Sequence, residues 1–296
     1  MKIALVTAAE ARSLDEDLPA LLSAFERRGV TAEAVVWDDS AVPFHSYDAA
    51  IVRSTWDYAP RRDAFVAWAR GLPTRLLNAP EVIAWNTDKR YLAELAARGV
   101  PITKTWWVTP GDAFEIPNGE IVVKPAISGG AKDTARYTAS ERDRALAHVR
   151  RLSADGRVVM VQPYQSAVDT EGETALLFFG GVYSHAIRKG PILVRGAGTV
   201  EGLFAKEDIE ARTPTTRERE IAEAVLDAVP MGRDALAYAR VDLIPGNEGA
   251  PILLELELVE PSVFLAYAEG AADRFAAAIL ERVGKRSETV RNPDCR

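Results

Sequence analysis

Cysteine is nearly absent from this chain. The only cysteine in the 296 residues is Cys295, near the C-terminus, so no disulfide can form within the chain and we expect a cytoplasmic protein. Histidine is also scarce, and His45, His148 and His185 show none of the spacings of a zinc site. The sequence therefore offers neither a disulfide framework nor a histidine zinc centre.

A net positive charge and long apolar runs are lacking too. The net charge is −7 and the pI is about 5.2, which argues against a nucleic-acid-binding protein. No apolar run approaches the roughly 20 residues that span a bilayer, and the apolar stretch of residues 1–7 is too short for a signal peptide. With 48% hydrophobic and 27% charged residues, the composition is that of a soluble globular protein of two or three compact units.

The first third of the chain alternates two kinds of pattern. Short apolar runs predict strands, and helical spacing of apolar residues predicts helices. The strands are expected at 3–7, 34–37, 49–53 and 75–77, and the helices at 14–28 and around 65–69. This alternation indicates a parallel sheet covered on both faces. Thr7-Ala8-Ala9-Glu10 stands where a glycine-rich loop would follow the first strand, which argues against a nicotinamide-binding Rossmann unit.

Polar side chains follow the third predicted strand. Arg53, Ser54 and Thr55 stand just before Trp56-Asp57-Tyr58, at the carboxyl edge where ligands bind in such sheets. A cation, two hydroxyls and two aromatic rings could hold a small polar substrate. The alternative is a satisfied turn with Trp56 packed inward.

The middle third carries a candidate phosphate site. A helix is expected over 87–98, strands over 105–108, 120–124 and 157–161, and a helix from Ser140 to Leu152. Lys124 ends the second of these strands, just before Ser128-Gly129-Gly130, whose small residues let backbone amides approach an anion. Surface turns use the same residues, so the motif alone leaves both interpretations open.

The segment that follows the strand over 157–161 has two interpretations as well. Gln162-Pro163-Tyr164 could present backbone groups to a flat heterocycle, or it could be plain core.

Acidic and apolar residues alternate near the C-terminus. Residues 253–260 read Leu-Leu-Glu-Leu-Glu-Leu-Val-Glu and follow Arg240-Val241-Asp242, which predicts a strand with one acidic face. Glu255 and Glu257 would lie on one side, with their Cα atoms about 7 Å apart. A divalent cation would remove their repulsion, and Mg²⁺ usually takes one or two carboxylates plus substrate phosphates. The alternative is an exposed edge strand whose acids resist aggregation.

In this order the segments resemble the ATP-grasp superfamily, in its branch similar to prokaryotic glutathione synthetases, over residues 2–283. The resemblance implies ATP as cofactor, phosphate-binding lysines before and within a lid, a glycine loop that closes over the phosphates, and a hinge that pairs with adenine. The implied ATP-binding residues are Lys89, Lys124, Ser128, Gly129, Gly130, Gln162, Pro163, Tyr164 and Glu173.

The same resemblance implies two Mg²⁺ ions bound by Asp242, Glu255 and Glu257. Glu257 departs from the family pattern, which has Asn there, and it keeps an oxygen ligand with one more negative charge. The implied catalytic residues near the phosphoryl and acyl groups are Arg188, Arg240, Arg195 and Gly196. The substrate residues expected from both domains are Arg53, Ser54, Thr55 and Ser262.

The implied fold is α/β with α+β elements. We expect a Rossmann-like parallel-sheet domain over 1–85, a central lid domain over 86–165 and a mixed-sheet catalytic domain over 166–285, followed by a polar tail over 286–296.

The implied activity is that of an ADP-forming ligase, in which a substrate carboxylate becomes an acyl phosphate that a nitrogen attacks. Segments 53–58 and 85–92 resemble a small cyclo-ligase that converts O-ureido-D-serine to D-cycloserine, with release of CO₂ and ammonia. An intermolecular carboxylate–amine ligase and a non-catalytic nucleotide-binding regulator remain open. We expect a small amino-acid substrate, no nucleic acid or membrane partner, and a chain compatible with a homodimer.

Overall fold

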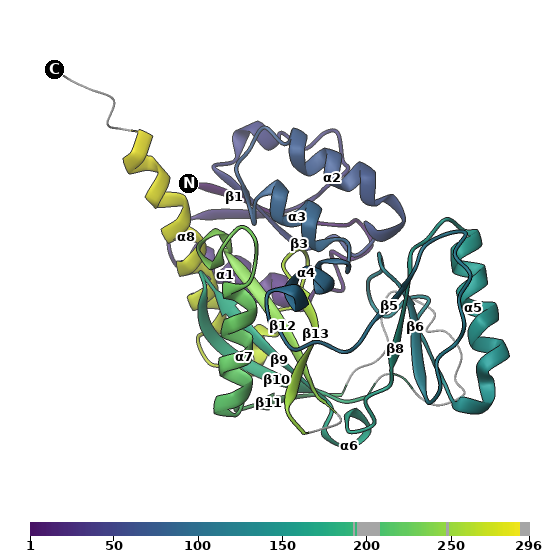
Figure 1. Ribbon diagram of the computed structural model, residues 1–296. Helices are drawn as coiled ribbons and strands as arrows, with labels where there is room; N and C mark the ends of the chain where they lie inside the picture. Colours follow the sequence, from purple (N-terminus) through teal and green to yellow (C-terminus); the bar gives the residue numbers. More distant parts are fainter. Residues whose placement is uncertain (192, 194–207, 247–248, 291–296) are drawn as a thin grey trace.

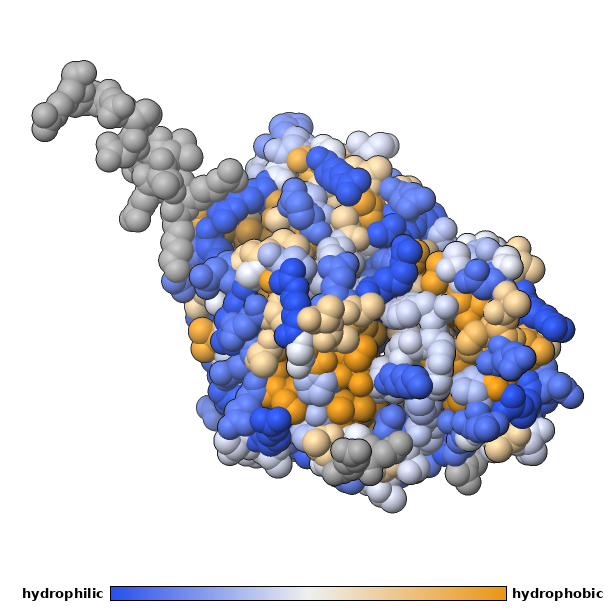
Figure 2. Space-filling view, viewed as in Figure 1, coloured by the Kyte–Doolittle hydropathy of each residue, from blue (hydrophilic) through white to orange (hydrophobic). Residues whose placement is uncertain are grey.

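The computed structural model describes residues 1–191, 193, 208–246 and 249–290. Within these residues the strands form three sheets, with helices packed against them (Figure 1). In the same ranges no helix is long and apolar enough to cross a membrane. Figure 2 shows a largely hydrophilic surface on one face, with apolar residues gathered near its middle.

The N-terminal sheet is parallel, as the alternating pattern predicts. Its strands lie in the order β2-β1-β3-β4. Their bounds are Lys2–Thr7 for β1, Thr31–Val36 for β2, Ala49–Ser54 for β3 and Leu76–Leu77 for β4. Ile3 and Leu5 of β1 pack into one hydrophobic cluster and Ala4 and Val6 into another, so the strand is buried on both faces.

Helices cover both faces of this sheet. The helix α1 (Asp17–Glu26) and the C-terminal α8 (Ala271–Val290) share the cluster of Ile3, whereas α2 (Arg62–Gly71) shares the cluster of Ala4. The expectation that α1 begins at Leu14 is wrong, and Leu14 is 50% exposed. The helix begins later because the Asp15 carboxylate accepts the Asp17 amide at 3.0 Å, which makes a turn before it.

Two short helices, α3 (Pro80–Asn86) and α4 (Tyr91–Ala97), lead away from this sheet. A continuous helix over 87–98 is therefore a wrong expectation, because a turn separates α3 from α4. The Asp88 carboxylate accepts the amide of Arg90, and the Lys89 amide donates to the Ala126 carbonyl at 2.9 Å. These bonds place Lys89 in the turn, directed towards the next sheet.

The central sheet is antiparallel, in the order β5-β8-β6-β7. Its strands are β5 (Trp106–Val108), β6 (Ile121–Pro125), β7 (Ala135–Tyr137) and β8 (Val159–Pro163). The helix α5 (Arg142–Ala154) covers one face (Figure 1). Thr138, rather than Ser140, caps the short turn that leads into α5, because its side chain pairs with Glu141 in a capping box.

The C-terminal sheet has the order β11-β10-β9-β12-β13, and its described ladders are antiparallel. Its strands are β9 (Glu173–Phe179), β10 (Val182–Lys189), β11 (Ile209–Arg212), β12 (Tyr238–Pro245) and β13 (Pro251–Glu257). A parallel bridge between Ile102 and Leu253 gives it the mixed character that the fold implies. The helix α7 (Thr216–Asp227) packs on the face of Leu176, and α8 packs on the face of Leu177.

The remaining elements are short. They are the helix α6 (Val168–Glu171) and the 3₁₀ turns η1 (Phe44–Ser46), η2 (Ala59–Arg61), η3 (Ala139–Glu141), η4 (Arg233–Ala235) and η5 (Leu265–Tyr267). The domain boundaries drawn from the sequence stay predictions. The first sheet lies within 2–77, the central sheet within 106–163 and the third within 173–257.

Candidate active site

A cavity of about 1050 Å³ takes its lining from all three sheets. Trp56, Asp57 and Tyr58 reach it from the end of β3, Lys124 from β6, and Glu255 from β13. Such a volume suits a nucleotide-sized ligand with a second small molecule. The cavity is therefore the candidate active site.

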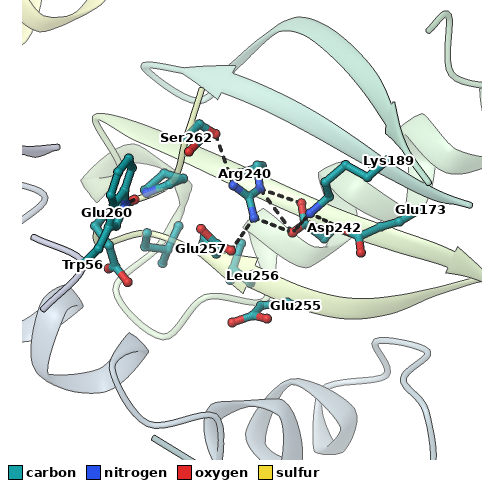
Figure 3. Close-up of polar contacts among 12 residues, drawn as sticks. Trp56, Glu173, Lys189, Arg240, Asp242, Glu255, Leu256, Glu257, Glu260 and Ser262 are labelled. Atoms are coloured by element: carbon teal, nitrogen blue, oxygen red, sulfur yellow. Dashed lines mark hydrogen bonds and ion pairs between the residues drawn. The ribbon is translucent and has the colours of Figure 1, made fainter. Parts of the chain in front are cut away.

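Alternating charges line the cavity floor on β12 and β13. The strand register sets Asp242 opposite Glu255 and Arg240 opposite Glu257. Arg240 donates to both oxygens of Asp242 at 2.8 Å and also contacts Glu257, as Figure 3 shows. Arg240 also donates to the Ser262 carbonyl at 3.2 Å. The guanidinium thus joins the predicted metal ligands to a predicted substrate residue.

Two lysines pair with further acids of the cavity. Lys89 pairs with Glu255 at 3.0 Å and donates to the Ser128 carbonyl at 2.7 Å, so it joins β13 to the glycine loop. Lys189 contacts Glu173 and pairs with Asp242 at 3.1 Å. Opposite charges held this closely in a buried place favour their ionised forms.

The pKa values follow the balance of burial and charge. Burial raises the pKa of Glu257 to about 7 and that of Glu173 to about 8, although nearby cations oppose it. Burial lowers the pKa of Lys124 to about 8. Burial would also raise the pKa of Asp242, but Arg240 and Lys189 outweigh it and lower that pKa. The floor thus holds groups that readily change charge when a ligand binds.

The described residues include no three His, Cys, Asp or Glu side chains gathered closely enough to hold a metal ion by themselves. The reason is visible in the contacts: Asp242, Glu255 and Glu257 each face a cationic side chain. A polyphosphate would compete for these cations and release carboxylate oxygens, which are the ligands that Mg²⁺ prefers.

The glycine loop and the hinge lie at the other side of the cavity. Ser128, Gly129 and Gly130 line it, and a Cβ on Gly129 would meet no atom within 4 Å, so no packing demands a glycine there. Gln162, Pro163 and Tyr164 also line it, at the end of β8.

Side chains fix the hinge. Gln162 donates to the Thr105 hydroxyl at 2.8 Å. The Arg136 guanidinium lies 3.4 Å from the Tyr164 ring centroid, and the Tyr164 hydroxyl donates to Asp169 at 2.6 Å. These contacts hold the end of β8 in place where it lines the cavity.

Arg188 does not reach the cavity. Its guanidinium donates to the carbonyls of Glu171 and Thr170, at 2.7 and 3.2 Å. Lys189, the next residue on β10, faces the cavity instead, because successive side chains of a strand point to opposite faces. The structure thus corrects the expected place of Arg188. Arg195 and Gly196 lie outside the described residues.

The predicted substrate residues separate into two groups. Ser262 lines the cavity, whereas Arg53, Ser54 and Thr55 are buried behind it. Arg53 is 1% exposed and donates to the Pro261 carbonyl at 2.8 Å. The aromatic and acidic residues after them, Trp56-Asp57-Tyr58, form the wall in their place. The substrate roles of Arg53, Ser54, Thr55 and Ser262 stay predictions, and of these four residues only Ser262 lines the cavity.

The segment 256–262 at the end of β13 has side chains of the N-terminal part as its backbone partners. Asn86 donates to the Leu256 carbonyl at 2.8 Å and accepts the Leu258 amide at 2.7 Å. Similar bonds to the segment's carbonyls come from Asn78, Tyr91, Arg53 and Trp56, and one more comes from Tyr238 of β12 in the C-terminal sheet. These bonds set where Glu257 and Glu260 point.

Sequence reasoning missed Lys189, Asn86 and Glu260, which all line the cavity. Lys189 could have been found from its place directly after Arg188 on one strand. The burial of Asn86 and the exposure of Glu260 to the cavity depend on packing that no local pattern encodes.

Comparison with known proteins shows the family to which this chain belongs. The family model for the N-terminal domain of D-cycloserine synthetase DcsG matches residues 3–78. The cycloserine biosynthesis protein DcsG of Streptomyces lavendulae is 42% identical over an alignment of 296 positions, which covers 95% of this chain and 98% of that relative. The chain belongs to the D-cycloserine synthetase family.

Solved structures agree with this membership. A crystal structure of D-cycloserine synthetase DcsG, 40% identical, superposes with a TM-score of 0.87 over 96% of this chain and 100% of that chain. A D-alanine–D-alanine ligase from Bacillus anthracis complexed with ATP, 13% identical, reaches 0.71 over 98% of this chain and 99% of that chain. The second likeness shows the fold, which is that of the ATP-grasp ligases. This member of the D-cycloserine synthetase family is thus an enzyme of the ligase class.

Proposed function

We propose that this chain is an ATP- and Mg²⁺-dependent ligase that closes O-ureido-D-serine into D-cycloserine. The observation that carries this proposal is the 42% identity to a cycloserine biosynthesis protein, which extends over nearly the whole of both chains. The cavity supports it, because it collects acids, lysines and an arginine at one place.

The proposed reaction balances in three steps. The substrate carboxylate attacks the γ-phosphorus of ATP, which gives an acyl phosphate and ADP. The oxygen-bound ureido nitrogen attacks the acyl carbon, so that phosphate and one proton leave and the ring closes. Water then cleaves the carbamoyl group, which leaves as carbamate and decomposes to CO₂ and ammonia. Because the nitrogen is tethered to the reacting carbon, effective molarity accelerates the closure.

ATP would lie between the central and C-terminal sheets. Lys89 and Lys124 would bind the phosphates together with the Ser128–Gly130 backbone, since all of them line one cavity and Lys89 contacts Ser128. The hinge at Gln162–Tyr164 would receive the adenine, and Glu173 would lie near the nucleotide.

Two Mg²⁺ ions would be held by Asp242, Glu255 and Glu257 together with phosphate oxygens. The donor set fits, since all three are carboxylates on the cavity floor. When bound, the ions neutralise charge on the triphosphate and the transferring group. Freed from these carboxylates, Arg240 and Lys189 would turn their positive charge to the phosphoryl and acyl oxygens.

The substrate would lie between Ser262 and the Trp56–Tyr58 wall. Arg53, Ser54 and Thr55 would act on it through the segment that they support, since they lie behind the cavity. Cytoplasmic localisation, where ATP is available, stays a prediction. Homodimer formation also stays a prediction, and light scattering of the purified chain tests it.

The test supplies O-ureido-D-serine, ATP and Mg²⁺ with no other amine and identifies products by mass spectrometry. D-Cycloserine, ADP, phosphate and ammonia should appear together. If ADP forms only when a second amino acid is added, and the product is an amide of the two, the chain is an intermolecular ligase and the cyclisation is wrong.

A further inference from the structure

Most acids of the cavity have a cationic partner. Asp242, Glu255, Glu257 and Glu173 pair with Arg240, Lys89 or Lys189. Three more acids of the lining are paired, as Asp57–Arg61, Asp88–Arg90 and Asp133–Arg157.

Glu260 differs from these acids. Among the described residues its carboxylate has no hydrogen bond and no ion pair, although it lines the cavity and is only partly accessible. Glu10 and Asp155 also line the cavity without an ion pair in the described part of the chain, but both are exposed to solvent at its rim. Water can stabilise these two charges more fully than that of Glu260, which is less accessible to solvent.

The backbone holds Glu260 in this position. Its carbonyl accepts the Trp56 indole N–H at 3.1 Å (Figure 3). The following Pro261 carbonyl accepts a hydrogen bond from Arg53 at 2.8 Å. The flanking residues are therefore tied to the N-terminal sheet. These two hydrogen bonds fix the direction of the Glu260 side chain better than a free loop would.

The electrostatic surroundings favour a bound cation. Burial and the negative charge of Glu257 raise the pKa of Glu260 to about 8, while Lys89 lowers it and Glu255 adds to the rise. The negative charge of Glu260 also contributes to the raised pKa values of Tyr58 and Tyr238. Arg240 lies near enough to lower the pKa of Glu260. A ligand cation beside Glu260 would relieve this unfavourable charge.

We propose that the Glu260 carboxylate binds the α-ammonium group of the amino-acid substrate and so sets the enzyme's preference for α-amino acids. This inference rests on the proposed function. The α-ammonium is the only cationic group of O-ureido-D-serine, and Glu260 is the partly accessible cavity acid that forms no ion pair with any described residue.

The position agrees with the direction of the reaction. In an α-amino acid the ammonium and the carboxylate are bonded to the same carbon. An ammonium on Glu260 would therefore leave the carboxylate close by, on the side of Glu257 and Arg240, where the metal ions and the phosphoryl group are proposed. The ureido chain would extend towards the same acyl carbon from the other side.

The experiment compares the parent with Glu260→Gln, which keeps the side-chain shape and removes the charge. The substrates are O-ureido-D-serine and its analogue in which hydrogen replaces the α-amino group. Loss of a charge-assisted contact should raise the KM for O-ureido-D-serine at least about tenfold, equivalent to about 1.4 kcal/mol. The KM for the analogue should be the same in both proteins, and Mg–ADP binding should be unchanged.

Glu10→Gln, an exposed acid of the same cavity, is the matched control and should keep the parent's KM. If Glu260→Gln keeps the parent's KM, or raises the KM for both compounds equally, the carboxylate does not bind the ammonium and the inference is wrong. The proposed function would survive that result, because the parent would still convert O-ureido-D-serine.

If the parent leaves O-ureido-D-serine unchanged, the proposed function fails, and binding then decides the inference. In the presence of Mg–ADP, calorimetric titration with D-serine and with 3-hydroxypropionate separates the two outcomes. Tighter binding of D-serine that disappears in Glu260→Gln supports the inference. Equal affinity of parent and variant for D-serine overturns it.

Discussion

At the scale of single residues, the site is a set of charges that compensate one another until a ligand arrives. Arg240 contacts both Asp242 and Glu257, and Lys89 pairs with Glu255. Burying such charges is costly, and removing one partner leaves the other uncompensated unless it has a second. Arg240 has a second partner in Asp242, which makes Glu257 suitable for substitution.

Glu257→Gln should fold and yet bind Mg²⁺ poorly. The amide keeps an oxygen near the metal but removes one negative charge, so we expect at least about a tenfold rise in the Mg²⁺ concentration for half-maximal turnover. A Mg²⁺ titration of ADP release measures it. Glu269→Gln, at an exposed glutamate, is the control. If the variant keeps the parent's Mg²⁺ dependence, Glu257 is not a metal ligand.

At the scale of elements, the segment 256–262 shows how side chains can replace a neighbouring strand. Asn86 meets the Leu256 carbonyl and the Leu258 amide much as a β-partner would, and no other described residue accepts a hydrogen bond from that amide. A buried backbone amide without a partner costs about 1–3 kcal/mol.

Asn86→Leu should therefore lower the free energy of unfolding by about 2 kcal/mol, and it should reduce turnover because the direction of Glu257 and Glu260 changes. Urea unfolding and a steady-state assay measure the two effects. Asn118→Leu makes the same change at an exposed position and should alter stability by at most about 0.5 kcal/mol. Equal stability of both variants would contradict the role of Asn86.

The helix α5 carries a buried histidine on its sheet-facing side. His148 is 5% exposed, and its Nδ1 lies 3.0 Å from the Tyr137 hydroxyl. Burial lowers the pKa of His148 from 6.5 to about 4. The folded protein therefore disfavours the charged ring that the unfolded chain readily forms.

Stability should fall as the pH drops from 6.5 towards 4, because the unfolded chain binds a proton there and the folded one does not. At pH 5 the loss from His148 should be about 2 kcal/mol relative to pH 7. In His148→Gln this part of the pH dependence should vanish, whereas His45→Gln, at an exposed histidine, should behave like the parent. Urea unfolding at pH 5 and 7 is the measurement, and an unchanged slope in His148→Gln would contradict it.

At the scale of the whole molecule, the cavity receives side chains from three sheets, so a ligand there bridges them. Binding to the folded state alone stabilises it by about 2.7 kcal/mol at a ligand concentration one hundred times Kd.

Mg–ADP at that concentration should raise Tm by about 5 °C. Lys124→Met, which removes a proposed phosphate ligand, should lose most of this shift, whereas Lys104→Met, at an exposed lysine, should keep it. Thermal scans with and without Mg–ADP test this. A full shift in Lys124→Met would show that the nucleotide does not use this lysine.

The sequence by itself determined the periodic elements and the order of the motifs. Apolar runs marked β1, β3, β6 and β13, because burial on a sheet demands alternation or a continuous apolar run. The order of Lys89, Lys124, Asp242 and Glu255 indicated the family, and all four residues lie in one cavity. Local spacing suffices for such features.

Only the tertiary structure decided which neighbour faces the cavity. Arg188 and Lys189 differ by one step along β10, and a one-residue shift reverses every side chain of a strand, so the register against β9 had to be known. Arg53 lies near the carboxyl end of β3, at the sheet edge where ligands bind in such folds, yet its packing against the segment 256–262 buries it. The isolation of Glu260 likewise depends on where the cations of three distant segments lie, which spacing along the chain does not encode.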